Sequence, residues 1–388
     1  MARKRPTRKV RVDFRPNRQV RRRTDDWTRQ YRAAEEDLQD STRSESVRAK
    51  GDLSRKRTIL MGDASLPGVD ETQWLRGTVM KVHGLLSTVL DERGDRWECT
   101  VRRILRTLLI DSRAPVSVGD RVWFCDQTKA SDGVRSGVIE RVAERTTRLS
   151  RRDRRKREHT IVANADQLLA VVSVAQPRLR PHLVDRYIVA SLKGELRPVL
   201  CFNKVDLIGG DTRPEDDDEH PTGQSIWDII DEFRGLGYQC IATSAVTRDG
   251  VDELRAALQD HITVLSGQSG VGKSSLINAL QPGLDLMVRT VSDENEKGRH
   301  TTSLAELLPL DFGGFVVDTP GIRAFDLWSV EPGELEAYFI EMIPRVSQCR
   351  FNNCTHRNEE GCAVIAAVEN GEISARRYYS YVKMFEEV

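Results

Sequence analysis

A glycine-rich segment in the second half of the chain constrains the fold more than any other feature. Residues 267–274 read Gly-Gln-Ser-Gly-Val-Gly-Lys-Ser, which matches the pattern G-x-x-x-x-G-K-[ST]. An apolar run precedes this segment at 262–265, and a helical pattern follows it at 275–280. A strand, a glycine loop and a helix in this order predict a phosphate-binding loop at one edge of a parallel α/β sheet.

The residue types in this loop indicate how it would hold a nucleotide. Glycines let backbone N–H groups converge on phosphate oxygens at the N-terminus of the helix. Lys273 is expected to reach the β and γ phosphates, and the Ser274 hydroxyl is expected to ligate Mg²⁺. The predicted nucleotide contacts of this loop are Gly267, Gln268, Ser269, Gly270, Val271, Gly272, Lys273, Ser274 and Ser275.

Apolar runs alternate with helical stretches over about residues 160–326, as expected for a parallel sheet covered by helices. The strand-like runs are 167–174, 197–202, 239–242, 262–266 and 315–318. Residues 332–388 have a helical pattern that a short Cys/His loop interrupts. These patterns predict an α/β domain followed by a helical one.

A second motif, at the end of the run 197–202, indicates the base of the nucleotide. It consists of Asn203, Lys204, Val205 and Asp206. The Asp206 carboxylate can accept hydrogen bonds from guanine N1–H and the guanine 2-amino group, which adenine does not offer. The loop that meets the guanine oxygen in GTPases is predicted at Thr243, Ser244 and Ala245. The two elements together favour GTP over ATP.

Two further elements follow the phosphate loop. Thr302, in a Thr-Thr pair, can close over Mg²⁺, and Asp318 with Gly321 in an Asp-Thr-Pro-Gly segment can sense the γ-phosphate. An ordinary GTPase has its phosphate loop first and its guanine-reading motif last, whereas here Asn203 precedes Gly267. The cyclic order is unchanged, so we predict a circularly permuted GTPase domain. The segment after Gly321 then leads directly into the C-terminal residues and can transmit the γ-phosphate state to them.

Two different patterns precede the α/β region. Residues 74–142 contain five short alternating runs separated by glycine turns, which favours an oligonucleotide-binding barrel over residues 71–147, with another small barrel as the alternative.

Residues 1–70 are polar, with twelve Lys and Arg and three Asp in the first thirty positions. They are expected to form a disordered basic arm, because they hold too little apolar surface to offset chain entropy. Such an arm either contacts nucleic-acid phosphates or only adds solubility.

A cysteine and histidine cluster lies near the C-terminus. Its spacing is C-x₄-C-x-H-x₅-C, formed by Cys349, Cys354, His356 and Cys362. Three thiolates and one imidazole suit tetrahedral Zn²⁺, and four protein ligands leave no open position for catalysis. We therefore predict a structural zinc site, with buried structural cysteines and a redox pair as alternatives. Nearby arginines are expected to form a basic rim for RNA: Arg345, Arg350, Arg357, Arg376 and Arg377.

Composition limits the class and the location of the protein. The 388 residues are 39% apolar and 31% charged, which excludes a collagen, a mucin and a wholly disordered chain and allows two or three domains. No window approaches the roughly 18 apolar residues of a membrane span, and the start of the chain has no apolar signal-peptide core. The acids Asp13, Asp25 and Asp26 argue against a transit peptide. We expect a soluble, cytoplasmic protein without a disulfide scaffold.

The motifs together resemble those of the RsgA/YjeQ family, the circularly permuted GTPases of bacterial small-ribosomal-subunit assembly. The resemblance covers about residues 74–388 and rests on 137–142, 149–151, 203–206, 267–275, 298–302, 318–321 and the zinc cluster. It implies a multidomain fold with an oligonucleotide-binding β-barrel at 71–147, a permuted α/β GTPase at 148–328 and a helical zinc-binding domain at 329–388. It also implies that the immature small subunit and its rRNA are the partner, that this RNA stimulates hydrolysis, and that a monomer is released once GDP forms.

The resemblance also suggests a catalytic residue. Ile322 stands after Gly321, where many GTPases have the glutamine that orients the attacking water. His300, in the family's G-x-H-T-T segment, is our candidate for this role, and a solvated loop histidine is the alternative. The other residues with expected catalytic roles are Lys273, Thr302 and Asp318. A long N-terminal arm and an acidic stretch at 211–219 depart from the family pattern without removing a motif residue.

The leading hypothesis is an RNA-dependent GTPase switch in small-subunit maturation, which uses GTP/GDP, Mg²⁺ and one structural Zn²⁺. A scaffold that binds RNA and GTP with little turnover is the second hypothesis. The intact motif residues argue against it: Lys273, Ser274, Thr302 and Asp318. An ATP-dependent kinase or transporter subunit is the third, and Asp206 argues against it because an unpaired buried carboxylate would penalise ATP.

Overall fold

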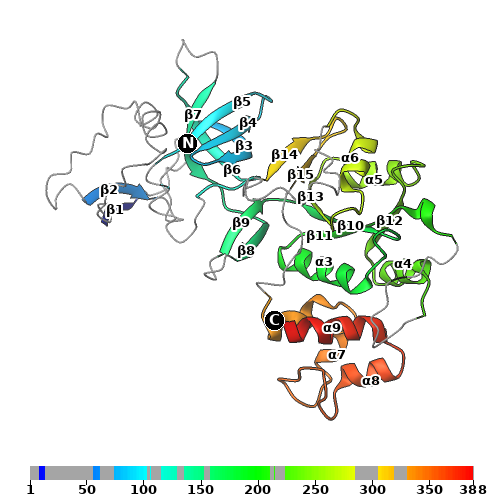
Figure 1. Ribbon diagram of the computed structural model, residues 1–388. Helices are drawn as coiled ribbons and strands as arrows, with labels where there is room; N and C mark the ends of the chain where they lie inside the picture. The colour runs from blue at the N-terminus through cyan, green and yellow to red at the C-terminus, as the bar shows by residue number, and fades with distance from the viewer. Residues whose placement is uncertain are drawn as a thin grey trace, which may run out of the picture. The chain divides into compact units, whose positions relative to one another are not determined.

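The computed structural model divides into two units, Met1–Gln73 and Trp74–Val388 (Figure 1). It describes residues 8–13, 56–61, 74–102, 105, 115–128, 135–152, 158–209, 214, 223–284, 305–318 and 330–387. In the first unit, strands β1 (Arg8–Asp13) and β2 (Lys56–Met61) pair antiparallel. The sequence did not predict this strand pair, and the rest of the expected basic arm lies outside the described residues.

The second unit begins with a closed five-stranded barrel. Its strands are β3 (Leu75–His83), β4 (Leu86–Asp91), β5 (Arg96–Val101), β6 (Arg121–Asp126) and β7 (Ser136–Val142). The order is β3-β4-β5-β7-β6, the pairing of β3 with β6 closes the barrel, and only β5 and β7 run parallel. Alternate residues such as Val89 and Phe124 are fully buried inside. This arrangement confirms the predicted oligonucleotide-binding type of barrel.

An α/β sheet follows the barrel. Parallel strands lie in the order β12 (Gln239–Thr243), β11 (Arg197–Asn203), β10 (Gln167–Ser173), β13 (Ile262–Ser266) and β15 (Phe315–Asp318). All seven residues of β10 are buried, as expected for a strand covered on both faces. Each of the predicted strand runs forms one of these strands.

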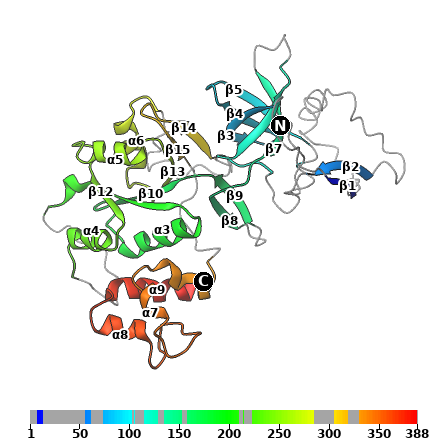
Figure 2. The ribbon, with the colours of Figure 1, turned by 180° about the vertical axis from the view of Figure 1, so that it is seen from behind.

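Helices cover the two faces of this sheet in pairs. The alternation of residues along β10 sends Leu168 into the core with α3 (Pro181–Lys193) and α4 (Ile226–Gly235). Its neighbour Leu169 packs into the opposite core, with α5 (Val251–Leu258) and α6 (Lys273–Leu280). Figure 2 shows the two helix pairs on either side of β10 and β13. A 3₁₀ turn, η2 (Val205–Leu207), follows β11.

The barrel and the α/β sheet are joined edge to edge. Strand β14 (Glu306–Pro309) pairs antiparallel with β15 and, through Glu306, with Lys81 of β3. The Lys81 ammonium also forms a 2.6 Å ion pair with the Glu306 carboxylate. A second antiparallel pair, β8 (Arg148–Arg152) and β9 (Glu158–Ala163), lies between the two domains in sequence.

The C-terminal residues form a small helical module, as predicted. Its elements are η4 (Pro332–Tyr338), α7 (Ile343–Val346), α8 (Ala363–Glu369) and α9 (Ala375–Glu387). They share a core that contains the fully buried Phe339, Met342 and Met384. Among the described residues, no helix is both long and apolar enough to cross a membrane.

Candidate nucleotide site and metal centre

The predicted phosphate loop connects β13 to α6, as the sequence pattern required. Gly267 has φ +145°, and a Cβ on it would lie 2.2 Å from the Val171 carbonyl oxygen. Gly272 has φ +95°, and a Cβ there would lie 2.4 Å from Asn203 Nδ2. Side chains at these two positions would clash, so both glycines are needed for the backbone to approach its neighbours.

Lys273 and Ser274 occupy the first turn of α6, at the end where helix N–H groups attract anions. Lys273 Nζ donates to the carbonyl oxygens of Gly267 at 2.6 Å and Gln268 at 2.8 Å. The ammonium therefore lies over the loop backbone, where a phosphate chain would lie. Ser274 is half-buried beside it.

Asn203 connects the guanine-reading motif to the phosphate loop. It is buried at the end of β11, and its Nδ2 donates to the Val271 carbonyl at 2.8 Å. Its Oδ1 accepts from the Thr243 hydroxyl at 3.2 Å. One amide thus holds together three segments that are far apart in sequence.

Lys204 makes a second connection. Its backbone is left-handed, with φ +68°, and its Nζ donates to the Gly270 carbonyl at 2.7 Å and to the Gln176 carbonyl. Burial lowers the pKa of Lys204, and the Asp206 carboxylate partly opposes this. Asp206 itself is exposed in η2, next to the half-buried Val205.

The loop after β12 is shaped by its serine. Ser244 is fully buried, and its hydroxyl accepts from the backbone N–H groups of Val246 and Thr247 at 3.2 and 3.1 Å. These bonds hold the turn at residues 245–247, which includes Ala245. The structure therefore brings the phosphate loop, residues 203–206 and residues 243–245 to one edge of the sheet.

The remaining predicted residues of the nucleotide site are only partly described. Thr302, His300 and Gly321 lie outside the described residues. Asp318 is the last residue of β15 and pairs through its backbone with Glu306, and its side chain is not described.

Sequence reasoning missed the loop that follows β10. This loop brings the Gln176 carbonyl to Lys204, and its residues Arg178 and Arg180 line a small cavity together with Gln268. Its position after a strand of the sheet was the signal that would have identified it, since ligands of open α/β sheets bind at the carboxyl ends of strands.

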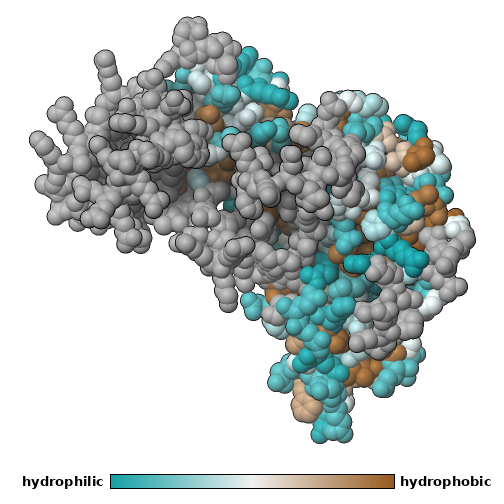
Figure 3. Space-filling model, in the orientation of Figure 1, coloured by the Kyte–Doolittle hydropathy of each residue, from teal (hydrophilic) through white to brown (hydrophobic). Residues whose placement is uncertain are grey.

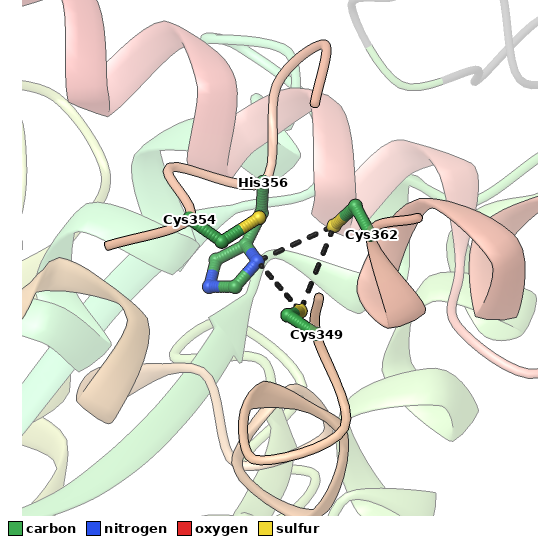
Figure 4. Close-up of side chains that lie close together, drawn as sticks. All are labelled: Cys349, Cys354, His356 and Cys362. Carbon is green, nitrogen blue, oxygen red and sulfur yellow. Dashed lines mark hydrogen bonds between the residues drawn. The ribbon is translucent and has the colours of Figure 1, made fainter. Parts of the chain in front are cut away.

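The four predicted metal ligands come together in the C-terminal module. Their ligand atoms all lie within 4.8 Å of one another. Figure 4 shows the His356 ring facing two of the three sulfurs, with Nδ1 3.5 Å from Cys349 Sγ and 3.4 Å from Cys362 Sγ. Cys349 and Cys362 Sγ are 3.9 Å apart. A tetrahedron with Zn–S bonds of about 2.3 Å has sulfur–sulfur edges of about 3.8 Å, so the set fits Zn²⁺.

The chemistry of the thiols supports a cation in this site. Burial, together with the neighbouring Cys362 and Cys349 thiols, raises the pKa of Cys354 to about 12. The thiolate forms that ligate a metal therefore need a compensating positive charge, which a divalent cation supplies.

Residues outside the ligand set orient the histidine. His356 Nε2 lies 2.6 Å from a Glu336 carboxylate oxygen, so the carboxylate favours the tautomer that leaves Nδ1 for the metal. The His356 carbonyl accepts from the Tyr378 hydroxyl at 2.9 Å. Glu336 belongs to η4, the first described element after the Asp-Thr-Pro-Gly segment.

The predicted basic rim is wrong for Arg376 and Arg377. Both are buried, and both donate to the fully buried Asp185 of α3, at 3.0 and 2.6 Å. They therefore connect α9 to the GTPase helices and are not available to RNA. The exposed surface of the module is mixed, and Figure 3 shows apolar areas between its polar ones.

The other three arginines of the expected rim lie closer to solvent. Arg345 pairs with Glu372, Arg350 lies 3.6 Å from Glu360, and Arg357 stacks on Phe385 at 4.6 Å. Exposed apolar side chains accompany them: Ile340, Ile343 and Phe351.

Comparisons with known proteins identify related sequences and structures. The family model described as RsgA GTPase matches residues 142–328. The small ribosomal subunit biogenesis GTPase RsgA of Thermotoga petrophila is 40% identical over 314 residues, which cover 81% of this chain and 96% of the relative. The chain belongs to the RsgA GTPase family. The protein of the same name from Yersinia enterocolitica is 36% identical over 328 residues, covering 83% of this chain and 88% of the relative.

Solved structures of the family confirm the architecture. The crystal structure of YjeQ from Thermotoga maritima has a TM-score of 0.60 and 38% identity, covering 81% of this chain and 98% of that one. YloQ, described as a circularly permuted GTPase, has a TM-score of 0.61 and 29% identity, covering 82% of this chain and 96% of that one. The predicted fold class is thus confirmed, and membership of the RsgA family makes the chain a GTPase.

Proposed function

We propose that this chain is a GTP-hydrolysing switch in the maturation of the small ribosomal subunit, whose rRNA it binds. The contacts of Asn203 carry the proposal, because they join the phosphate loop and the Thr243 loop at one edge of the sheet. The relatives are named small ribosomal subunit biogenesis GTPase RsgA, and this name supports the small subunit as the partner.

In this proposal the nucleotide lies across the carboxyl ends of β13, β11 and β12. The N–H groups of residues 267–275 and the Lys273 ammonium bind the phosphates. Ser274 and Thr302 would hold Mg²⁺, which would neutralise charge on the β and γ phosphates. Asp206 accepts the two guanine N–H groups, and the loop 243–245 meets the guanine oxygen.

Hydrolysis requires a group that orients the attacking water. We assign this role to His300, because Ile322 offers no polar atom at the usual position. Asp318 and Gly321 sense the γ-phosphate and pass its state to the C-terminal module. Without RNA the attacking water is poorly oriented, so GTP turnover is slow. The RNA of the small subunit orders the site and stimulates turnover. Formation of GDP then releases the protein from the subunit.

The metal has a structural role in this proposal. Zn²⁺ held by Cys349, Cys354, His356 and Cys362 fixes the loops of the small C-terminal module. In the same proposal the barrel spans residues 71–147, the GTPase spans 148–328 and the zinc domain spans 329–388. The protein acts as a cytoplasmic monomer.

Co-sedimentation with purified small subunits tests the switch. The protein with a non-hydrolysable GTP analogue is expected to sediment with small subunits, and the protein with GDP is expected to stay in the supernatant. Binding that is equal with both nucleotides would refute the switch. A Lys273→Ala variant, which loses nucleotide affinity, is the control for nucleotide dependence.

A further inference from the structure

The outer surface of the barrel has two sides with different chemistry. Barrels of this type bind oligonucleotides on the side of their second and third strands, here β4 and β5. The outward positions on that side include Thr88, Arg96, Glu98 and Thr100. One arginine next to one glutamate gives this side little attraction for phosphate.

The opposite side, formed by β3, β6 and β7, carries arginines around a tryptophan. Arg76 of β3 and Arg141 of β7 are the cross-strand partners of Trp123 of β6. The Arg141 guanidinium lies 5.0 Å from the centre of the Trp123 ring. Arg121 lies two residues before Trp123 on β6, so its side chain points to the same face. Figure 1 shows the three strands side by side. We call these four residues the arginine–tryptophan row.

The cations of the row differ from three other cations of the barrel. Lys81, Arg102 and Arg135 each form an ion pair with a carboxylate. Within the described part of the chain, no acid lies within ion-pair distance of the arginines of the row. Arg141 Nε is also buried without an acceptor. The row therefore has positive charge and donor capacity that the described residues leave uncompensated.

We propose that the arginine–tryptophan row binds unpaired nucleotides of RNA, so that phosphates lie on its arginines and a base stacks on the Trp123–Arg141 pair. An aromatic ring next to guanidinium groups is the chemistry that binds single strands without sequence preference. Base stacking requires a base outside a duplex, which makes single-stranded segments the ligand. The inference rests on the proposed function and deepens it. It places the RNA contact of the barrel on the β3–β6–β7 side, opposite to the β4–β5 side that barrels of this type use.

The test measures binding of a fluorescein-labelled single-stranded 20-uridine RNA to the full chain by anisotropy at several salt concentrations. Arg76→Gln and Arg141→Gln are each expected to weaken binding severalfold and to reduce the salt slope by about 0.7. Trp123→Leu is expected to weaken binding by about fivefold or more, and Trp123→Phe, which keeps an aromatic face, is expected to restore most of it. Circular dichroism verifies the fold of each variant.

Arg96→Gln is the matched control, because it removes an exposed arginine from the β4–β5 side. Binding unchanged by Arg96→Gln supports the row. An equal loss for Arg96→Gln and Arg141→Gln, or full binding by Trp123→Leu, would refute it. The experiment needs no GTP, so failure of the row is distinct from failure of the switch, which nucleotide-dependent sedimentation with small subunits measures separately.

Discussion

Replacing Asp185 with asparagine should detach the C-terminal helix from the GTPase helices. Asp185 of α3 is fully buried and accepts from Arg376 at 3.0 Å and from Arg377 at 2.6 Å, both on α9. Glu341 and Glu232 complete the network, at 2.7 and 2.9 Å from these arginines. The amide would remove the central negative charge and direct an N–H group toward two cations.

The expected cost follows from burial. Breaking a buried ion pair by removing one partner costs about 3–5 kcal/mol, because the other charge stays in the interior. Glu341 and Glu232 still compensate Arg377 and Arg376, so we expect about 3 kcal/mol for Asp185→Asn. The same two helices carry a second pair, Arg186 with Glu387, that is partly exposed. Glu387→Gln should cost no more than about 1 kcal/mol.

Urea unfolding followed by circular dichroism measures both variants against the unmodified chain. Burial alone would raise the pKa of Asp185, but Arg376 and Arg377 outweigh it and hold the pKa below its ordinary value. A carboxylate with a lowered pKa stabilises the fold above its unfolded pKa of about 3.9, and this stability is lost as the pH falls through the folded value.

The difference between the chain and Asp185→Asn should therefore be constant from about pH 6 to 8 and shrink only below about pH 4. Equal costs for Asp185→Asn and Glu387→Gln would refute the buried network as the connection between α3 and α9.

Three further predictions concern the metal and the nucleotide. Glu336→Ala should lower zinc affinity about 10–100-fold, because His356 loses its orienting carboxylate. A competition titration with a chelator measures this affinity, and an unchanged affinity would contradict the role of Glu336. Glu360→Gln, an exposed position in the loop between His356 and Cys362, should retain zinc. Asp206→Asn should weaken GTP binding about tenfold or more in a calorimetric titration, and equal GTP affinity would remove Asp206 from guanine recognition. His300→Ala should reduce RNA-stimulated turnover with GTP affinity nearly unchanged, and normal stimulated turnover would exclude His300 from the mechanism.

Local patterns predicted the elements that carry the nucleotide site. Each segment of the site follows an apolar strand, so its place at the carboxyl edge of the sheet could be inferred from sequence alone. The contacts between the segments could not be inferred from sequence. The bond from Asn203 to Val271 joins residues 68 positions apart, and no periodicity encodes such a pair.

The C-terminal module shows the limit of reasoning from residue type. The spacing of Cys349 and its partners predicted the ligand cluster, because a metal requires a specific donor set. The same reasoning assigned Arg377 to the surface, because arginine is rarely buried without a partner. Its partner Asp185 lies 192 positions away, and only the fold brings the two together.

GTP turnover with and without ribosomal particles tests the central claim most directly. Phosphate release from GTP and from ATP would be followed with the purified chain alone, with small subunits and with large subunits. We predict slow turnover of GTP alone, strong stimulation by small subunits only, and no turnover of ATP. Turnover of GTP that no ribosomal particle changes, or that large subunits stimulate equally, would contradict a switch in small-subunit maturation.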